Sequence, residues 1–155
     1  MTALKEGAKA PAFSLQSDEG KTVKLSDFAG KTLVLYFYPK ADTPGCTRES
    51  CDFRDEIAVF KKAKAAVVGV SKDALPALQK FKAKYDLPFP LLSDPDHKVQ
   101  ETYGAWGTKN MYGKMVQGTI RSTVIIGPDG KVVKHFPKVK VDGHAQAVLE
   151  ALKSA

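Results

Sequence analysis

YPKADTPGCTRESC, from Tyr38 to Cys51, holds both cysteines of the chain and joins two segments of different periodicity. Before it, the run TLVLYFY from Thr32 to Tyr38 is short and rich in β-branched and aromatic residues, which predicts a strand buried on both faces. Proline and glycine then interrupt the run, and from Cys46 small or apolar residues recur at steps of three and four. The sequence therefore predicts a central strand that turns into a helix, with Cys46 at the helix start.

The place of Cys46 at a helix start has a chemical consequence. A helix N-terminus carries unpaired N–H groups and about half a positive charge, and both favour a thiolate over a thiol. Because the thiolate is the nucleophilic form of cysteine, Cys46 is the candidate reactive residue. The alternative from the residues alone is a buried structural cysteine, which is a common fate of a free cysteine in a core.

Cys51 lies five residues after Cys46, and helix geometry limits what the pair can do. In an α-helix, residues five apart have Cα atoms about 8 to 9 Å apart and side chains about 140° apart. A disulfide needs Cα atoms within about 7 Å of each other. A bond between the two cysteines would therefore require the first turns of the helix to unwind. A Cys51 that only packs beneath the helix would require no such change.

Length and composition limit the class of protein. A chain of 155 residues with 43% hydrophobic residues is expected to form a single domain over residues 1–155. The N-terminal residues MTALKEGAKAPAF lack the apolar region of a secretory signal. No apolar run is close to the length of about 18 residues that a membrane-spanning helix needs. A cytoplasmic protein with no membrane contact is therefore expected. The two cysteines and three scattered histidines form no zinc ligand set, so no metal or cofactor is expected.

The net charge of +7 raises the question of a nucleic-acid or acidic partner. Only three of the 24 basic residues are arginines, namely Arg48, Arg54 and Arg121, and the lysines are spread along the chain. Base-reading sites favour arginine and stacked aromatic side chains. The lysines are therefore interpreted as solvated surface, and no specific nucleic-acid site is expected.

The other segments predict strands that alternate with helices. An N-terminal β hairpin is expected between Pro11 and Leu25, and a second hairpin around the turn from Gly127 to Gly130. The helix after Cys46 is expected to run to about residue 62, whereas residues 104–118, with four glycines and no clear period, are expected to form a loop. The remaining expected elements are strands at 65–70 and 88–92, a helix capped by residues 71–73, a helix from 93 towards 103, and a last helix from about 142.

This order predicts an α/β fold with a mixed central sheet flanked by helices. In such sheets the functional site lies beyond the carboxyl ends of the central strands. Thr43 and Cys46 follow the expected central strand directly. The architecture and the chemistry of the cysteine therefore indicate the same place.

Pro39, Thr43 and Cys46 fit the pattern PxxxTxxC of the peroxiredoxins, and PKADTPGCTRESCDFRD resembles the bacterioferritin comigratory protein, or peroxiredoxin Q, subfamily. The resemblance covers nearly the whole chain, including residues 89–94, 103–107, 111–113 and 121–123. It implies a thioredoxin-like fold and a peroxidase that reduces hydrogen peroxide and organic hydroperoxides with electrons from thioredoxin or glutaredoxin. It also implies a monomer, as is common in this branch.

The same resemblance assigns roles to individual residues. It implies that Cys46 is the peroxidatic cysteine and Cys51 the resolving cysteine, joined in a transient intramolecular disulfide. It makes Thr43 and Arg121 the hydrogen-bonding partners of Cys46, and Pro39 the shield of the pocket. The residues expected to contact the peroxide are Thr43, Pro44, Gly45, Cys46 and Arg121.

From the residues alone, other roles stay open. Thr43 could be a turn or cap residue, a role in which threonine is common. Arg121 could be a surface charge at the start of a strand. Glu49 either orients an arginine or is a first-turn acid favoured by the helix dipole, and the first role is preferred here.

Two functions of other classes compete with a peroxidase. A thiol-disulfide oxidoreductase shares the expected fold but normally uses a CxxC spacing, whose cysteines bond with little unwinding. A non-catalytic binding or holdase module would act through the basic surface. Neither function explains why Pro39, Thr43, Cys46 and Arg121 occur together, so a peroxidase is the expected function.

Overall fold

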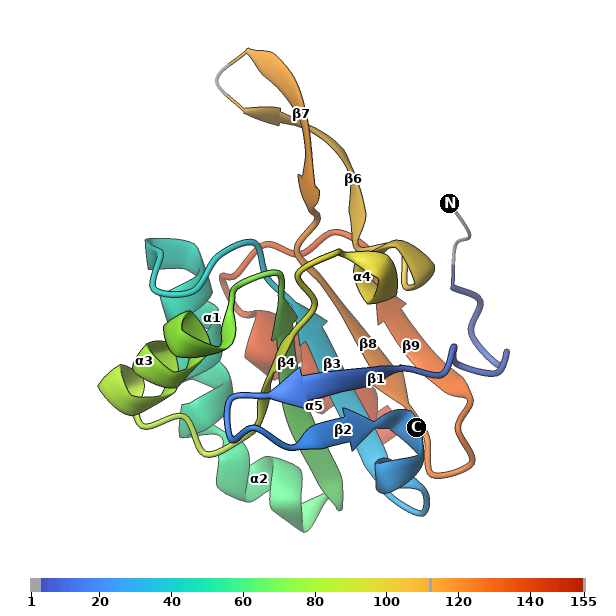
Figure 1. Cartoon of the computed structure of the whole chain (residues 1–155). Helices are drawn as coiled ribbons and strands as arrows, with labels where there is room; N and C mark the ends of the chain where they lie inside the picture. Colours follow the sequence, from blue (N-terminus) through green and yellow to red (C-terminus); the bar gives the residue numbers. More distant parts are fainter. Residues whose placement is uncertain (1–3, 112, 155) are drawn as a thin grey trace.

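The computed structural model describes residues 4–111 and 113–154, and within them a seven-stranded mixed sheet runs in the order β2-β1-β5-β4-β3-β8-β9 (Figure 1). β3 (Thr32–Phe37) is the strand predicted from the TLVLYFY run. It pairs in parallel with β4 (Ala65–Ser71) and antiparallel with β8 (Ser122–Ile126). Five of its six residues are buried, so the prediction of a central, two-sided strand is confirmed.

Two hairpins form the edges of this sheet, as the turn residues predicted. β1 (Ser14–Ser17) and β2 (Thr22–Lys24) pair antiparallel at one edge, and β1 also pairs with β5 (Leu91–Ser93). At the other edge, β9 (Val132–Phe136) pairs antiparallel with β8. The N-terminal hairpin is therefore part of the main sheet.

Helices cover the two faces of the sheet unequally. One face packs against α1 (Pro44–Asp55), α2 (Ile57–Lys62), α3 (Leu75–Tyr85) and α5 (His144–Ser154). The other face is covered by the N-terminal segment, the 3-10 helix η1 (Leu25–Phe28) and the short helix α4 (Lys98–Thr102). The expected mixed sheet flanked by helices is confirmed.

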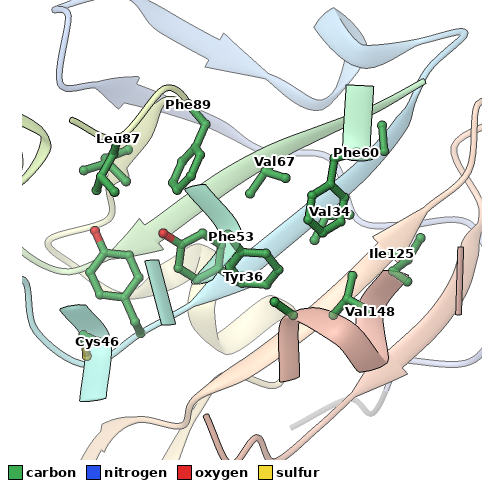
Figure 2. Close-up of a cluster of buried hydrophobic side chains, with 14 of the residues drawn as sticks. Val34, Tyr36, Cys46, Phe53, Phe60, Val67, Leu87, Phe89, Ile125 and Val148 are labelled. Atoms are coloured by element: carbon green, nitrogen blue, oxygen red, sulfur yellow. The ribbon is translucent and has the colours of Figure 1, made fainter. Parts of the chain in front are cut away.

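The core between the sheet and α1 is largely aromatic (Figure 2). Tyr36 of β3 and Phe53 of α1 are fully buried, with ring centroids 4.9 Å apart. Phe60 of α2 also packs against Phe53, with ring centroids 5.8 Å apart. Aromatic pairs of this kind add about 0.5–1.5 kcal/mol to the burial of their surface, so they fasten α1 to the central strand.

The helix that was expected to continue to residue 62 is broken at Glu56, which corrects the sequence prediction. The backbone of Glu56 has φ −103° and ψ 9°, and its N–H donates to the carbonyl oxygens of Phe53 and Arg54 instead of continuing the α-helical pattern. α2 then begins at Ile57. Since no proline or glycine lies at the break, the local sequence gave no sign of it.

Residues 104–118 form a hairpin, so the prediction of a loop was wrong. β6 (Trp106–Met111) pairs antiparallel with β7 (Lys114–Thr119), and this hairpin projects from the body of the molecule (Figure 1). The first four residues of β7 are exposed, so the strand lacks the alternating burial that would mark it in a sequence. Tyr112 lies outside the described residues.

Residues 71–73, which were expected to cap the helix after β4, do not cap it. α3 begins at Leu75 after Ala74, which provides no side-chain cap. The carboxylate of Asp73 instead accepts hydrogen bonds from the backbone N–H of Ala41 and the hydroxyl of Ser71, both at 2.8 Å. Asp73 therefore ties the loop after β3 to the end of β4.

Helix α4 also begins later than expected, at Lys98 rather than near residue 93.

Within residues 4–111 and 113–154, no helix has both the length and the apolar character that a membrane crossing requires.

Gly69 of β4 lies opposite Tyr36, and a methyl group there would come within 2.8 Å of the Tyr36 ring. We expect Gly69→Ala to lower the free energy of unfolding by about 1–3 kcal/mol, because the fully buried ring cannot move aside without disturbing the core. Urea denaturation measures this loss. Val59→Ala, at a side chain that is 40% exposed, is the control and should change stability by less than about 0.5 kcal/mol. An equally small effect of Gly69→Ala would contradict the close packing of Tyr36.

Candidate active site

Cys46 is the third residue of α1 and lies at the turn between β3 and that helix. Thr43 is the N-cap and Pro44 the first helical residue, where the fixed φ of proline suits the helix and its missing N–H has no cost. The N–H of Thr47 donates to the carbonyl oxygen of Thr43 at 2.8 Å and closes the first turn. The predicted helix start is confirmed, and Cys46 is buried there, with 1% of its surface exposed.

Arg121 reaches Cys46 because of the direction of β8. β8 runs antiparallel to β3, so its first residue, Ser122, pairs with Phe37 at the carboxyl end of β3. Arg121, which precedes β8, is therefore delivered to the same end of the sheet as the start of α1. Its Nη2 donates to the Sγ of Cys46 at 3.2 Å.

The second arm of the Arg121 fork binds Glu49. Arg121 Nη1 donates to Glu49 Oε1 at 2.7 Å, and the Glu49 side chain is 1% exposed. Glu49 lies three residues after Cys46, so both side chains point from one face of α1 towards the guanidinium. The role that was preferred for Glu49, to orient an arginine, agrees with this contact.

Burial and charge act against each other in this ion pair. Burial raises the pKa of the Glu49 carboxyl to about 7, and the attraction of Arg121 opposes that rise. Burial alone would lower the pKa of Arg121, but the charges of Glu49 and Cys46 raise it above its usual value. Arg121 therefore stays protonated and fixed beside the sulfur.

Gly45 makes room for the guanidinium. A Cβ at this position would lie 3.1 Å from Arg121 Nη2, closer than most such contacts allow. A side chain at Gly45 would therefore require the Arg121 guanidinium to shift by a few tenths of an ångström. Sequence reasoning expected Gly45 to contact the peroxide, and the structure adds this packing requirement.

Thr43 and Pro39 lie in the loop that leads into α1. The Thr43 hydroxyl donates to the carbonyl oxygen of Lys40 at 2.8 Å, so in this structure it braces the loop. Pro39 lines a hollow of about 490 Å³ together with residues of the β6–β7 hairpin and of the segment that follows β9. Its full lining is Pro39, Thr108, Lys109, Met115, Thr119, Ile120, Arg121, Lys138 and Val139.

Cys51 lies in the middle of α1, and both cysteines are free thiols. Burial raises the pKa of Cys51, and the positive charge of Arg54 opposes the rise. Because α1 is continuous from Pro44 to Asp55, the two cysteines keep the helical spacing that excludes a disulfide. The structure therefore brings Cys46, Glu49 and Arg121 together and leaves Cys51 apart.

Sequence reasoning missed a buried hydrogen bond beside the site. The hydroxyls of Tyr36 and Ser50 lie 2.7 Å apart, and both side chains are fully buried. In the sequence, Ser50 is only one of the small or apolar residues that recur at steps of three and four after Cys46. Nothing in its local sequence pairs it with a tyrosine 14 residues earlier.

His144, at the start of α5, completes the surroundings of the core. Its Nε2 lies 2.8 Å from the Thr123 hydroxyl. Burial, helped by repulsion from Arg121, lowers the pKa of His144 to about 4, so the imidazole is neutral near pH 7. In the described part of the chain, no group of three or more His, Cys, Asp or Glu side chains is placed to hold a metal ion.

The chain as a whole is similar to proteins of a known family. Residues 7–135 match the AhpC/TSA family, and the chain belongs to that family. "Putative peroxiredoxin bcp" of Coxiella burnetii is 50% identical over 149 residues, which cover 96% of this chain and 99% of that protein. "Peroxiredoxin Bcp" of Bacillus subtilis is 48% identical over 147 residues, covering 95% and 94%.

Solved structures give the same result. Peroxiredoxin Q of Xanthomonas campestris superposes with a TM-score of 0.90 at 44% identity, covering 96% of this chain and 97% of that one. The resemblance to the peroxiredoxin Q subfamily and the thioredoxin-like fold expected from it are confirmed.

The raised pKa of Glu49 makes a prediction about stability. A carboxyl whose pKa is higher in the folded state than its usual value of 4.5 holds its proton more tightly when folded. Its contribution to stability is therefore greatest below pH 4.5 and is lost as the pH rises through about 7. We expect the free energy of unfolding of the wild type, relative to Glu49→Gln, to fall across this window.

Urea denaturation of both proteins at a series of pH values measures this difference. The other titrating groups are common to both proteins and cancel in the comparison. A difference that stays constant with pH would show that Glu49 titrates as an ordinary carboxyl.

Proposed function

We propose that Cys46 is the reactive residue of a thiol peroxidase that reduces hydrogen peroxide and organic hydroperoxides. The observation that carries this proposal is the contact of Arg121 with the Cys46 sulfur at 3.2 Å, because it places a permanent cation where a thiolate reacts. The relatives support it. They are named peroxiredoxins, and the bacterioferritin comigratory protein of Xanthomonas campestris, 43% identical to this chain, has been studied for alkyl peroxide reduction.

In the first step, the Cys46 thiolate attacks the terminal oxygen of the peroxide. A sulfur–oxygen bond forms as the oxygen–oxygen bond breaks, and the leaving hydroxide or alkoxide takes up a proton to become water or an alcohol. Arg121 stabilises the negative charge as it moves from sulfur to the leaving oxygen. Thr43, Pro44 and Gly45 form the wall against which the peroxide is held, and Pro39 shields it from solvent.

In the second step, the sulfenic acid on Cys46 condenses with the thiol of Cys51, releasing water and forming an intramolecular disulfide. Without a second thiol, more peroxide would oxidise Cys46 to the sulfinic acid. Because the helical spacing keeps the cysteines apart, part of α1 must unwind before this step.

In the third step, a dithiol protein such as thioredoxin, or alternatively glutaredoxin, reduces the disulfide by thiol–disulfide exchange. The family membership supports a thiol reductant in general. The choice of thioredoxin, the monomeric state, the single domain over residues 1–155 and the cytoplasmic location stay predictions from the sequence.

The first test treats the fully reduced protein with an equimolar amount of hydrogen peroxide, followed by denaturation, intact mass measurement and peptide mapping. We expect loss of the two thiol hydrogens and a linkage between Cys46 and Cys51. An added oxygen on Cys46 without a linkage would keep the peroxidase but remove Cys51 from the cycle. An unchanged mass, together with insulin-disulfide reduction by the protein, would instead support a thiol-disulfide oxidoreductase.

The second test concerns the Arg121 fork. We expect Arg121→Gln to slow the reaction of Cys46 with peroxide about 10²-fold, the loss typical of removing one group that stabilises transition-state charge. Arg121→Lys keeps the charge but not the fork that holds both Cys46 and Glu49, so it should restore only part of the rate. Stopped-flow measurement of the first step gives these rates.

Arg48→Gln is the matched control on the same helix. Arg48 pairs with Asp142 at 2.5 Å, but the two side chains are 59% and 81% exposed, and exposed pairs contribute little. The control should react at the rate of the wild type. An equal effect of the two substitutions would show that net charge, rather than the Arg121 contact, sets the rate.

A further inference from the structure

Helix α1 has to unwind for Cys46 to reach Cys51, and the structure indicates where that unwinding stops. This inference rests on the disulfide step of the proposed function. The two cysteines lie on one continuous helix, Pro44–Asp55, which contacts the sheet along a single buried face. Members of that face are Cys46, Glu49, Ser50 and Phe53.

The second half of α1 is fixed by contacts that do not depend on the state of Cys46. Phe53 is fully buried, and its ring lies 4.9 Å from Tyr36, 5.8 Å from Phe60 and 5.9 Å from His144 between centroids. Arg54 Nη1 donates to the carbonyl oxygen of Tyr85 at 2.7 Å, which ties the helix end to α3. Release of this half would expose the Phe53 side chain to water, so most of the free energy gained by burying that side chain would be lost.

The first half of α1 is held by the Arg121 guanidinium and by the packing of Cys46 in the hydrophobic core. Its side-chain hydrogen bonds are those of Cys46 and Glu49 to the two arms of Arg121. When Cys46 becomes a sulfenic acid, the sulfur loses its negative charge and the attraction to Arg121 weakens. The reaction with peroxide therefore loosens the first half and leaves the anchors of the second half intact.

The boundary between the halves is the hydrogen bond between Ser50 and Tyr36, at 2.7 Å. Tyr36 lies in β3, between β4 and β8, and Gly69 leaves no free space beside its ring. If Ser50 moved away from its position against the sheet, the buried Tyr36 hydroxyl would lose its hydrogen-bond partner, which is unfavourable in free energy. After the packing of Cys46, unwinding that begins at Pro44 therefore meets its first side-chain hydrogen bond independent of Arg121 at Ser50.

We propose that the Tyr36–Ser50 hydrogen bond stops the unwinding of α1, so that Cys46 moves while Cys51 stays in place. Residues 44–49 leave the helical conformation and bring the Cys46 sulfenic acid to the Cys51 thiol. Residues 50–55 stay on the sheet and hold the Cys51 thiol as a fixed target. The Cys51 sulfur then attacks the Cys46 sulfur, the sulfur–oxygen bond breaks, and the hydroxyl leaves as water with the thiol proton. Ser50 and Tyr36 are thus positioning residues for the resolving step.

A double-mutant cycle in both redox forms tests this proposal. Tyr36→Phe, Ser50→Ala and the double variant each remove the hydrogen bond without removing the ring or the helix. The disulfide form is prepared with diamide, a thiol oxidant, so the test does not depend on peroxide chemistry. Urea denaturation of the reduced and disulfide forms measures whether the two substitutions act independently.

We expect the two substitutions to destabilise less than additively, and by the same margin, in both redox forms. That result means that the hydrogen bond survives disulfide formation. Non-additivity in the reduced form alone would show that α1 opens beyond Ser50 and would overturn the proposal. Additive effects in both forms would show that the bond has no energetic role and would also overturn it.

A second measurement tests the positioning role directly. With excess peroxide, Cys46 is divided between the disulfide with Cys51 and the sulfinic acid, and mass spectrometry measures the ratio. If Ser50 holds Cys51 in place, Ser50→Ala raises the sulfinic fraction relative to disulfide roughly fivefold, the factor that loss of one such hydrogen bond gives. A lower sulfinic fraction in Ser50→Ala would mean that the hydrogen bond slows the resolving step, and an unchanged fraction would mean that it has no effect on that step. Either result would contradict the positioning role.

Val68→Ala is the matched control. Val68 is fully buried in the cluster on the opposite face of the sheet, so its truncation lowers global stability without touching α1. This variant should keep the ratio of the wild type. Failure of the proposed function gives a different result, namely a wild-type protein that consumes no peroxide. The double-mutant cycle in reduced and diamide-oxidised protein can be interpreted even in that case.

Discussion

The guanidinium of Arg121, held between the sulfur of Cys46 and the carboxylate of Glu49, is the interaction on which the rest of the site depends. It requires a helix that begins at the end of β3, a neighbouring strand of opposite direction, and a glycine that leaves space. Each of these features belongs to a different part of the chain. The fold of the sheet is therefore what converts an ordinary cysteine into a candidate nucleophile.

Burial of this ion pair has two effects. Glu49 and Arg121 are taken out of water, which is unfavourable for isolated charges, so each needs the other. The same exclusion of water strengthens the field of Arg121 at the sulfur. Glu49 fixes the direction of the guanidinium, and Arg121 in turn keeps a buried carboxylate tolerable. A residue of each sign is thus needed even though only one of them touches the sulfur.

The sequence predicted the elements that an apolar pattern or turn-forming residues mark. The TLVLYFY run was recognisable from its continuous apolar character, whereas proline and glycine marked the helix start at Cys46 and the hairpin at Gly127 to Gly130. The β6–β7 hairpin was missed because its exposed residues carry no such pattern, and the break at Glu56 because it contains neither proline nor glycine. Roles implied by family resemblance located Arg121, whereas the partnership of Ser50 and Tyr36 depends on packing that no local sequence encodes.

Cys46 and Arg121 are 75 residues apart in the chain. During synthesis, Cys46 leaves the ribosome long before Arg121 exists, and the strand that carries Arg121 to the sulfur pairs only after most of the domain has been made. Contacts between residues so far apart also form late in folding, because the intervening loop must first be closed. The environment that activates the thiol is therefore absent from the nascent chain, and reactivity appears only with the completed fold.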